Sequence, residues 1–450
     1  MHSAAITCII SGNMNAVVTF VVLSALLVAG KILRMQIPLL QRMYLPSSVV
    51  GGMLGLVLIR WAGPAVPQEI LSEMSGVPGF LINVIFAALF LGAAVPKVRD
   101  VVRLAFPQLC LGQMIAWGQY VVGLGLAGLL FTRFFGVPAA FGNLLEIGFE
   151  GGHGTVGGMA EAFAAFGWED GIALGYTMAT AGMVTGIVLG MALIQWAHRR
   201  GYVKQVRSFR DRCAHERRGV HPKDRRPSAG RQTVYGDSID SLAWHVAIVG
   251  IAVLIGWGMR LLIPMKGFPL FPLCMIGGAM LQYGACALKT DLLVDRVQME
   301  RISGAALDYL VVSAVSTIRV EVVAANWQPL VILMAAGTAW TVWCVLFVAP
   351  RIFDSAWFER AMAEFGQATG VTATGLMLLR TVDPENKTSA AAGFGYKQLF
   401  HEPVMGGGVW TALALPLVYK IGWLNVFLVS SAMLLLWSAA AFAVARRRKR

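Results

Sequence analysis

The chain has 450 residues, of which 57% are hydrophobic and only 14% are charged, and its mean hydropathy is +0.66. Soluble domains carry about 25% charged residues, so this composition excludes a soluble globular protein and predicts one that crosses a membrane many times. The net charge of +13 is concentrated, because 12 of the 37 Lys and Arg lie between Arg199 and Arg231 and five end the chain. Such clusters are typical of cytoplasmic loops rather than of a nucleic-acid-binding surface.

The six cysteines show no paired spacing, and four of them lie in apolar runs. We therefore predict neither a disulfide framework nor a zinc site, and we expect no cofactor. The first residues lack the charged segment that precedes the apolar run of a cleaved signal peptide, so we expect no such peptide.

Apolar stretches of bilayer-spanning length recur along the chain. The predicted spans of the first half are 15–33, 44–61, 80–95, 104–131 and 171–197. Those of the second half are 242–263, 269–288, 302–320, 328–350, 388–418 and 422–445. Between the halves, residues 198–241 are polar, basic and interrupted by Pro and Gly, which predicts a flexible cytoplasmic linker.

The positions of Lys and Arg predict how these spans are oriented. With the N-terminus outside, the inner segments hold 30 of the 37 basic residues and the outer segments hold four. Cytoplasmic segments are enriched in these residues, so we predict an outer N-terminus and a cytoplasmic C-terminus. Five spans, an odd number, then precede the linker, so a second copy of a five-span unit would be inverted.

A weak internal repeat agrees with this arrangement. Residues 46–54 read PSSVVGGML and residues 272–280 read PLCMIGGAM, an offset of 226, while ALGY at 173–176 is echoed by GFGY at 393–396, an offset of 220. A near-constant offset of half the chain predicts two related bundles around one central site. We thus predict an all-α polytopic membrane protein with inverted five-helix repeats. The expected divisions are repeats over 1–197 and 242–420, the linker over 198–241, and an extra transmembrane helix with a basic tail over 421–450.

Each repeat also contains one segment that is too rich in glycine and polar residues for a plain span. These segments cover about 138–167 and 359–384, each between the fourth and fifth spans of its repeat. We predict re-entrant hairpins, which membranes tolerate only where protein or water satisfies the exposed backbone. Helix N-termini at such breaks attract anions, and freed carbonyls with Thr hydroxyls suit Na⁺.

The candidate residues for binding substrate and ion lie in these two segments. In the first they are Glu150, Gly151, Gly152, His153, Gly154 and Thr155. In the second they are Gly366, Gln367, Thr369, Gly370, Thr372, Thr374 and Arg380. A Na⁺ site is expected near Thr155 and Thr369, with its ligands left open. Helix packing by small residues, a structural role for His153 and a surface pair of Arg380 with Asp383 are the alternatives.

The first hairpin and the span after it carry a recognisable pattern. Residues 150–155 read EGGHGT and residues 179–186 read ATAGMVTG, which resembles the GGHGT and ATxGxVxG pattern of the bacterial sodium/glutamate symporter family. The resemblance implies inverted repeats, a homodimer in the bacterial inner membrane, elevator-like movement of a substrate-carrying core, and Na⁺-coupled uptake of glutamate. The second hairpin departs from the family pattern, since Gln367 replaces a histidine, the proline is absent and Arg380 follows. A related amino-acid or dicarboxylate anion therefore stays open as the substrate.

Three other functions compete with Na⁺-coupled symport. Proton coupling through Glu146, Glu150 or His153 is a close variant, because carboxylates and histidine carry protons as readily as they bind ligands. An intramembrane enzyme could use His153 and Glu150 as an acid–base pair, but the chain has no nucleophile elbow and no HExxH metal pair. A passive channel is less consistent with an inverted repeat. We expect a transporter without enzymatic activity.

Overall fold

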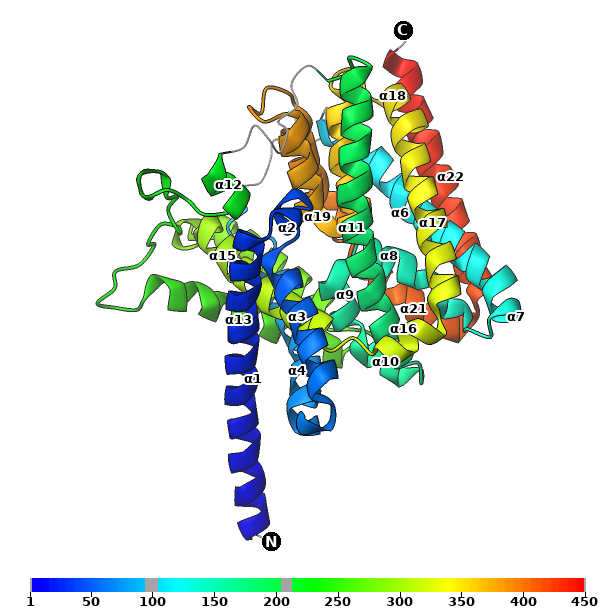
Figure 1. Ribbon diagram of the computed structural model, residues 1–450. Coiled ribbons are helices and arrows are strands. Elements are labelled where there is room, and N and C mark those ends of the chain that lie inside the picture. Colours follow the sequence, from blue (N-terminus) through cyan, green and yellow to red (C-terminus); the bar gives the residue numbers. More distant parts are fainter. Residues whose placement is uncertain (1, 94–103, 204–212, 449–450) are drawn as a thin grey trace. The chain divides into compact units, whose positions relative to one another are not determined.

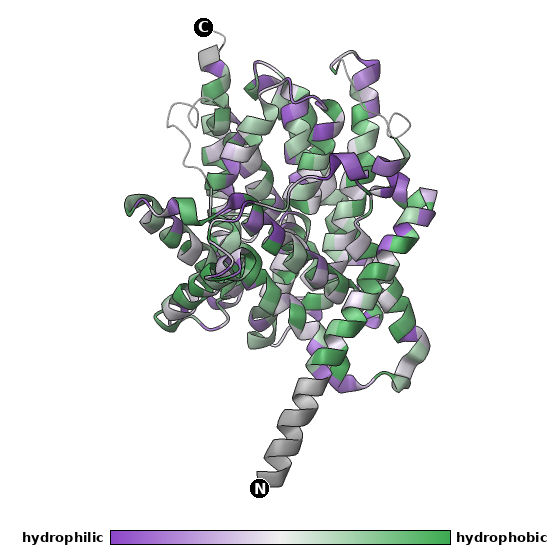
Figure 2. Ribbon diagram, turned by 90° about the vertical axis from the view of Figure 1, so that its left-hand side faces the viewer, coloured by the Kyte–Doolittle hydropathy of each residue, from purple (hydrophilic) through white to green (hydrophobic). Residues whose placement is uncertain are grey.

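The computed structural model describes residues 2–93, 104–203 and 213–448, and every regular element among them is a helix (Figure 1). Seven of these helices are long and apolar enough to cross a membrane. Figure 2 shows hydrophobic residues along most of the length of the long helices, and many hydrophilic residues in the connecting segments. The prediction of an all-helical, multi-pass membrane protein is confirmed.

The helices group into two compact units, and each unit takes segments from both halves of the chain. The first unit contains α1 (His2–Gln36), α2 (Pro38–Arg42), α3 (Ser47–Ala62), α4 (Gln68–Ala88), α12 (Ala214–Arg218), α13 (Ser241–Leu261), α14 (Phe271–Ala287) and α15 (Arg296–Ser316). The second unit contains α6 (Phe106–Leu126), α7 (Thr132–Phe134), α8 (Leu144–Phe149), α9 (Gly152–Gly158), α10 (Ala160–Ala165), α11 (Asp170–Arg199), α16 (Val320–Ala325), α17 (Trp327–Trp343), α18 (Ala349–Ile352), α19 (Trp357–Val382), α20 (Ala390–His401), α21 (Val409–Ile421) and α22 (Trp423–Arg448).

The first Gly-Gly pair of the sequence repeat lies in α3, between two other helices of the first unit. A Cβ atom added to Gly51 would lie 2.4 Å from the carbonyl oxygen of Leu26 in α1. One added to Gly52 would lie 2.6 Å from Cβ of Val315 in α15. The pair therefore lets α3 approach both neighbours at backbone distance, as small residues do in membrane helix packing.

The second pair, in α14, has the corresponding contacts. A Cβ atom added to Gly277 would lie 2.4 Å from the carbonyl oxygen of Ala252 in α13, and one on Gly278 would lie 2.1 Å from that of Ala87 in α4. In both pairs the first glycine contacts an earlier helix of its own half, and the second contacts a helix from the other half. The two Gly-Gly pairs therefore serve the same purpose, which is close approach between helices.

Two spans of the second unit share a further irregularity. A π-helical segment, Ala127–Phe131, follows α6, and another, Cys344–Val348, follows α17. Each lies near the end of a span that continues through it, Phe106–Phe134 and Trp327–Ile352. Such segments are rare in helices and often occur at functional positions.

The predicted single span over 388–418 is wrong. The structure instead has α20, which ends at His401, and α21, which begins at Val409. Residues 402–408 between them are not helical. Gly406 and Gly407 there have φ angles of +66° and +110°, which glycine adopts without steric cost.

Part of the predicted linker is in contact with the first unit. Lys31 Nζ in α1 donates a hydrogen bond of 2.6 Å to the carbonyl oxygen of Gly219. Gln298 Nε2 in α15 donates to Ser241 Oγ at 3.0 Å, and also to the carbonyl oxygen of Arg231. These contacts attach residues 219–241 to the ends of α1 and α15.

The glycine contacts predict a stability difference between two positions of the same helix. Gly278→Ala places a methyl group against the backbone of α4 and should destabilise the protein by about 1–3 kcal/mol. Gly284→Ala is the control, because nothing lies within 4 Å of the added atom, and this change should be neutral or stabilise by up to about 1 kcal/mol. Thermal unfolding of the purified variants in detergent measures the difference, and equal midpoints would contradict this packing.

Candidate functional site

The first Gly-rich segment contains a helix break at the predicted position. Helix α8 ends at Phe149, and α9 begins at Gly152, whose φ angle is +69°. Side chains disfavour this left-handed conformation, so glycine is the residue that allows the chain to turn here. The break leaves Glu150 and Gly151 between two short helices, and His153, Gly154 and Thr155 are buried in the first turn of α9.

The second Gly-rich segment is interrupted as well. Within α19, Gly370 (φ −158°, ψ 40°) and Val371 (φ 60°, ψ 172°) leave the helical conformation, so that two helical parts meet at these residues. A β-branched residue with positive φ is strained, and such strain is concentrated at functional sites. The surrounding contacts are close: a Cβ atom on Gly366 would lie 2.6 Å from Cα of Gly375, and one on Gly370 would lie 2.8 Å from Oγ1 of Thr374.

The two breaks lie against each other within the second unit. A Cβ atom added to Gly152 would lie 2.5 Å from Cγ1 of Val371. Two glycines of α11 pack against the residue before the second break. A Cβ atom added to Gly182 would lie 2.6 Å from the carbonyl oxygen of Thr369, and one added to Gly186 would lie 2.3 Å from Oγ1 of Thr369. The Gly-rich pattern of α11 therefore lets this helix approach the second break directly.

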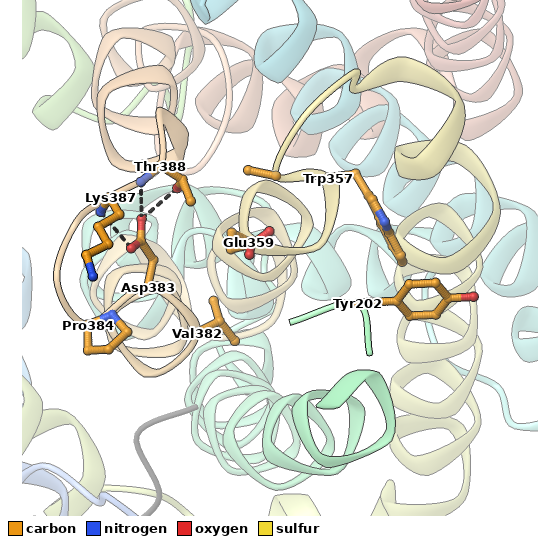
Figure 3. Close-up of a pocket in the computed structure, with 9 residues that line it drawn as sticks. Tyr202, Trp357, Glu359, Val382, Asp383, Pro384, Lys387 and Thr388 are labelled. Carbon is orange, nitrogen blue, oxygen red and sulfur yellow. Dashed lines mark hydrogen bonds between the residues drawn. The ribbon is translucent and has the colours of Figure 1, made fainter. Parts of the chain in front are cut away.

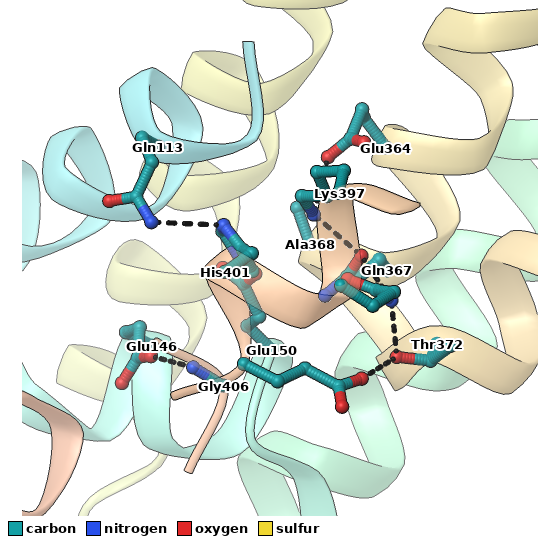
Figure 4. A network of polar contacts seen from close by, with 12 residues as sticks. Gln113, Glu146, Glu150, Glu364, Gln367, Ala368, Thr372, Lys397, His401 and Gly406 are labelled. Atoms are coloured by element: carbon teal, nitrogen blue, oxygen red, sulfur yellow. Dashed lines mark hydrogen bonds and ion pairs between the residues drawn. The ribbon is translucent and has the colours of Figure 1, made fainter. Parts of the chain in front are cut away.

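Helix α20 carries a lysine that is completely buried beside the second break. Lys397 Nζ lies 3.0 Å from Oε2 of Glu364 and donates a hydrogen bond of 2.8 Å to Oε1 of Gln367 (Figure 4). From α6, Gln108 Nε2 donates to the other carboxylate oxygen of Glu364 at 2.8 Å. The ion pair is thus held by hydrogen bonds from three helices, which is the condition under which a charge is tolerated away from water.

Other side chains of α20 join the two sides of the second break. Gln398 Nε2 donates to Gln367 Oε1 at 3.0 Å, before the break, and to Thr372 Oγ1 at 2.9 Å, after it. Thr372 in turn donates to Oε1 of Glu402 at 2.9 Å. Gln367 and Thr372 are therefore fixed in position by the helix that packs beside them.

The same helix reaches the first break through His401. Its Nε2 contacts Oε1 of Glu150, and its Nδ1 lies 3.2 Å from Nε2 of Gln113 in α6 (Figure 4). Trp117 donates to Oε1 of Gln113 at 2.8 Å, which turns the amide N–H toward Nδ1 and assigns the imidazole proton to Nε2. Glu150 Oε2 is buried and has no hydrogen-bond partner among the described residues. A free carboxylate oxygen at a helix break is a suitable ligand for Na⁺.

Glu146 is already saturated by protein donors. Its Oε2 accepts a hydrogen bond of 2.6 Å from the hydroxyl of Tyr120, and its Oε1 accepts bonds of 2.8 Å from the N–H of Gly406 and from Thr411 Oγ1. The carboxylate holds the segment between α20 and α21 against α6 and α8. We assign it a structural role and no contact with ligand.

Two predicted residues lie apart from the α20 contacts. His153 Nε2 is 2.9 Å from Thr180 Oγ1, and its ring stacks on Tyr176 with centroids 6.2 Å apart. Arg380 is exposed in the last turn of α19, and the structure does not bring it to the breaks.

Thr155 and Thr369 donate to carbonyls of their own helices, at 3.0 and 2.7 Å, so their oxygen lone pairs stay available as ligands.

A family model for the sodium/glutamate symporter matches residues 12–383, which include both helix breaks. The chain belongs to the sodium/glutamate symporter family. Its function is Na⁺-coupled transport of glutamate, and it is a transporter and not an enzyme. No individual curated protein matches the chain.

Lys397 and His401 of α20, which contact the two helix breaks, were not among the candidate residues selected from the sequence. Both lie beyond the part of the chain that matches the symporter family. Lys397 and His401 are four residues apart, and so share one helix face, in a segment that is otherwise mostly apolar. Ionisable residues inside an apolar membrane segment are expected to be functional. Reading 388–418 as a plain span concealed this signal.

The symporter also has a pocket of about 440 Å³ where the first turn of α19 meets the residues at and after its C-terminal end, and no residue of the helix breaks lines it (Figure 3). It is lined by Tyr202, Ala356, Trp357, Glu359, Val382, Asp383, Pro384, Lys387 and Thr388. Burial alone would raise the pKa of Asp383, but hydrogen bonds from Thr388 and from the N–H of Lys387 outweigh it and lower that pKa. Both carboxylate oxygens of Asp383 are thus engaged by hydrogen bonds from Lys387 and Thr388.

The contacts of Glu146 predict the effect of removing one hydroxyl group. Tyr120→Phe deletes a buried donor to a carboxylate and should destabilise the symporter by about 1.5–3 kcal/mol. Tyr283→Phe is the matched control, because this side chain is 79% exposed. Thermal unfolding in detergent compares the two, and a Tyr120→Phe midpoint equal to that of the control would show that Glu146 does not depend on this bond.

Proposed function

We propose that glutamate and Na⁺ bind at the two helix breaks of the second unit, and that the protein carries them inward by alternating access. The observation that carries this proposal is the contact between the breaks, where Gly152 and Val371 leave no room for a side chain. Broken helices whose interrupted ends meet are the usual ion and substrate sites of secondary transporters.

Each break contributes groups that suit an anionic substrate. Helix α9 starts at the first break, and the part of α19 after Val371 starts at the second. Helix N-termini present N–H groups without intrahelical partners and the positive end of the helix dipole. Gly151, Gly154 and Thr374 line the first turns of these helices, where a glutamate carboxylate could accept hydrogen bonds from backbone.

The coupling Na⁺ is assigned to oxygen atoms at the same place. Glu150 Oε2 is free of hydrogen bonds from the described residues, and the hydroxyl oxygens of Thr155 and Thr369 retain lone pairs. These are hard ligands of the kind that an alkali cation prefers. The donor set therefore fits Na⁺, and the proposed cation site lies next to the anion site, where opposite charges favour joint binding.

The proposed architecture is two inverted five-helix repeats with one re-entrant hairpin each. Three observations support it: the equivalent contacts of the two Gly-Gly pairs, the π-helical segments at an offset of 217 residues, and the contribution of both halves to both units. In this proposal α22 has no counterpart in the first half. The excess of basic residues in the inner segments supports an outer N-terminus and a cytoplasmic C-terminus.

The two compact units fit an elevator-like mechanism. The helix breaks and the buried polar contacts around them lie in the second unit, which we assign as the moving core. The first unit, which glycine contacts hold together, is assigned as the scaffold of a homodimer in the bacterial inner membrane. Gln367, which replaces the histidine of the family pattern, accepts hydrogen bonds from Lys397 and Gln398. Because these protein contacts account for the replacement, glutamate stays the proposed substrate.

The contact between the breaks can be tested with two glycines of the same backbone conformation. Gly152 and Gly167 both have φ +69°, but only Gly152 has a neighbour, Val371, within 4 Å of an added Cβ. Both alanine variants bear the strain of left-handed backbone, about 1–2 kcal/mol. Gly152→Ala also displaces one break from the other, so Na⁺-driven glutamate uptake into proteoliposomes should fall roughly 10- to 100-fold.

Gly167→Ala should keep uptake close to that of the unmodified protein when both are normalised to the amount of folded transporter. Equal uptake by the two variants would contradict the proposed site, because only the contact between the breaks distinguishes them.

A further inference from the structure

The Lys397 ammonium group is enclosed by oxygen atoms of the second hairpin. Its side chain is fully buried, and Nζ lies 3.0 Å from Glu364 Oε2 and 2.8 Å from Gln367 Oε1. Helix α6 closes the site from the other side: a Cβ atom on Gly112 would lie 2.6 Å from Lys397 Cε and 2.9 Å from its Nζ. The backbone of α6 is therefore packed directly over the ammonium group.

Lys397 is the cation that forms an ion pair with Glu364 among the described residues. Arg360, one turn earlier in α19, donates to the carbonyl of Leu104 and to Ser389 Oγ. Gln108 is neutral and supplies only a hydrogen bond to Glu364. Without Lys397, the Glu364 carboxylate would stay buried but lose this ion pair, and removing one partner of a buried pair is strongly destabilising.

We propose that the Lys397 ammonium is a permanent cation of the second break, held against Glu364 in the place that an exchangeable Na⁺ would otherwise take. Its charge and its oxygen neighbours are those of a bound alkali ion, but it is attached to the chain and cannot leave. Exchangeable Na⁺ then binds at the proposed site beside Glu150, whose Oε2 has no hydrogen-bond partner among the described residues, and not beside Glu364. This inference rests on the proposed function and adds which buried carboxylate, Glu150 or Glu364, binds the coupling ion.

The ratio of ²²Na⁺ to labelled glutamate taken up by proteoliposomes tests the inference. Lys397→Ala removes the ion-pair partner of Glu364 and opens space for an ion, so the ratio should rise by about one Na⁺ per glutamate. Adding Glu364→Gln to Lys397→Ala removes both charges and should restore the original ratio. Lys387→Ala breaks an exposed lysine–glutamate pair with Glu385 and should leave the ratio unchanged.

A Lys397→Ala protein that transports with the original ratio would overturn the inference. If the Lys397→Ala protein does not transport, its melting temperature is measured with and without added Na⁺ or n-propylammonium. The cation should raise the melting temperature of Lys397→Ala protein more than that of the unmodified protein. It should also raise it more than that of the double variant Lys397→Ala with Glu364→Gln. Equal stabilisation of all three would also overturn the inference. Failure of the proposed binding site can be distinguished from failure of this inference. The first would appear as normal uptake by Gly152→Ala protein, whatever ratio the Lys397→Ala protein gives.

Discussion

The second unit depends on one constraint: charged groups that are buried inside a protein must have partners. Helix α20 supplies these partners to both helix breaks, through Lys397 to Glu364 and through His401 to Glu150. Gln398 adds uncharged hydrogen bonds across the second break. Breaking a helix frees backbone groups, and proteins tolerate this in a membrane only where other protein groups or water satisfy them. Next to the second break, Gln119 of α6 donates to the carbonyl oxygen of Ala368 at 2.7 Å, while α20 holds the side chains beside both breaks.

Glycine provides the second constraint, which is close approach. In the first unit, the Gly-Gly pairs of α3 and α14 bring helices from the two halves of the chain to backbone distance. In the second unit, Gly182 and Gly186 bring α11 against Thr369. These positions contribute no polar chemistry, yet they determine where polar groups lie. A transporter whose units move as bodies needs such rigid packing inside each unit.

Composition, hydropathy and the Gly-rich pattern were enough to predict a helical membrane protein, its family and the positions of both helix breaks. These features are local, since a break follows from glycine at one place in the chain. The partners were not predictable in the same way, because Lys397 and Glu364 are 33 residues apart and meet only after folding. Arg380 was selected for its charge, but helix geometry places it about three turns beyond Gly370, at the exposed end of α19.

A structure of the purified protein with Na⁺ and L-glutamate would test the central claim most directly, because it shows where the ligands bind. The account predicts glutamate density beside Gly152 and Val371, with a cation within contact distance of Glu150 Oε2. Glutamate bound elsewhere, for example in the pocket lined by Trp357 and Asp383, would contradict it. So would a structure in which Glu150 Oε2 gains a protein partner and no ligand lies between the breaks.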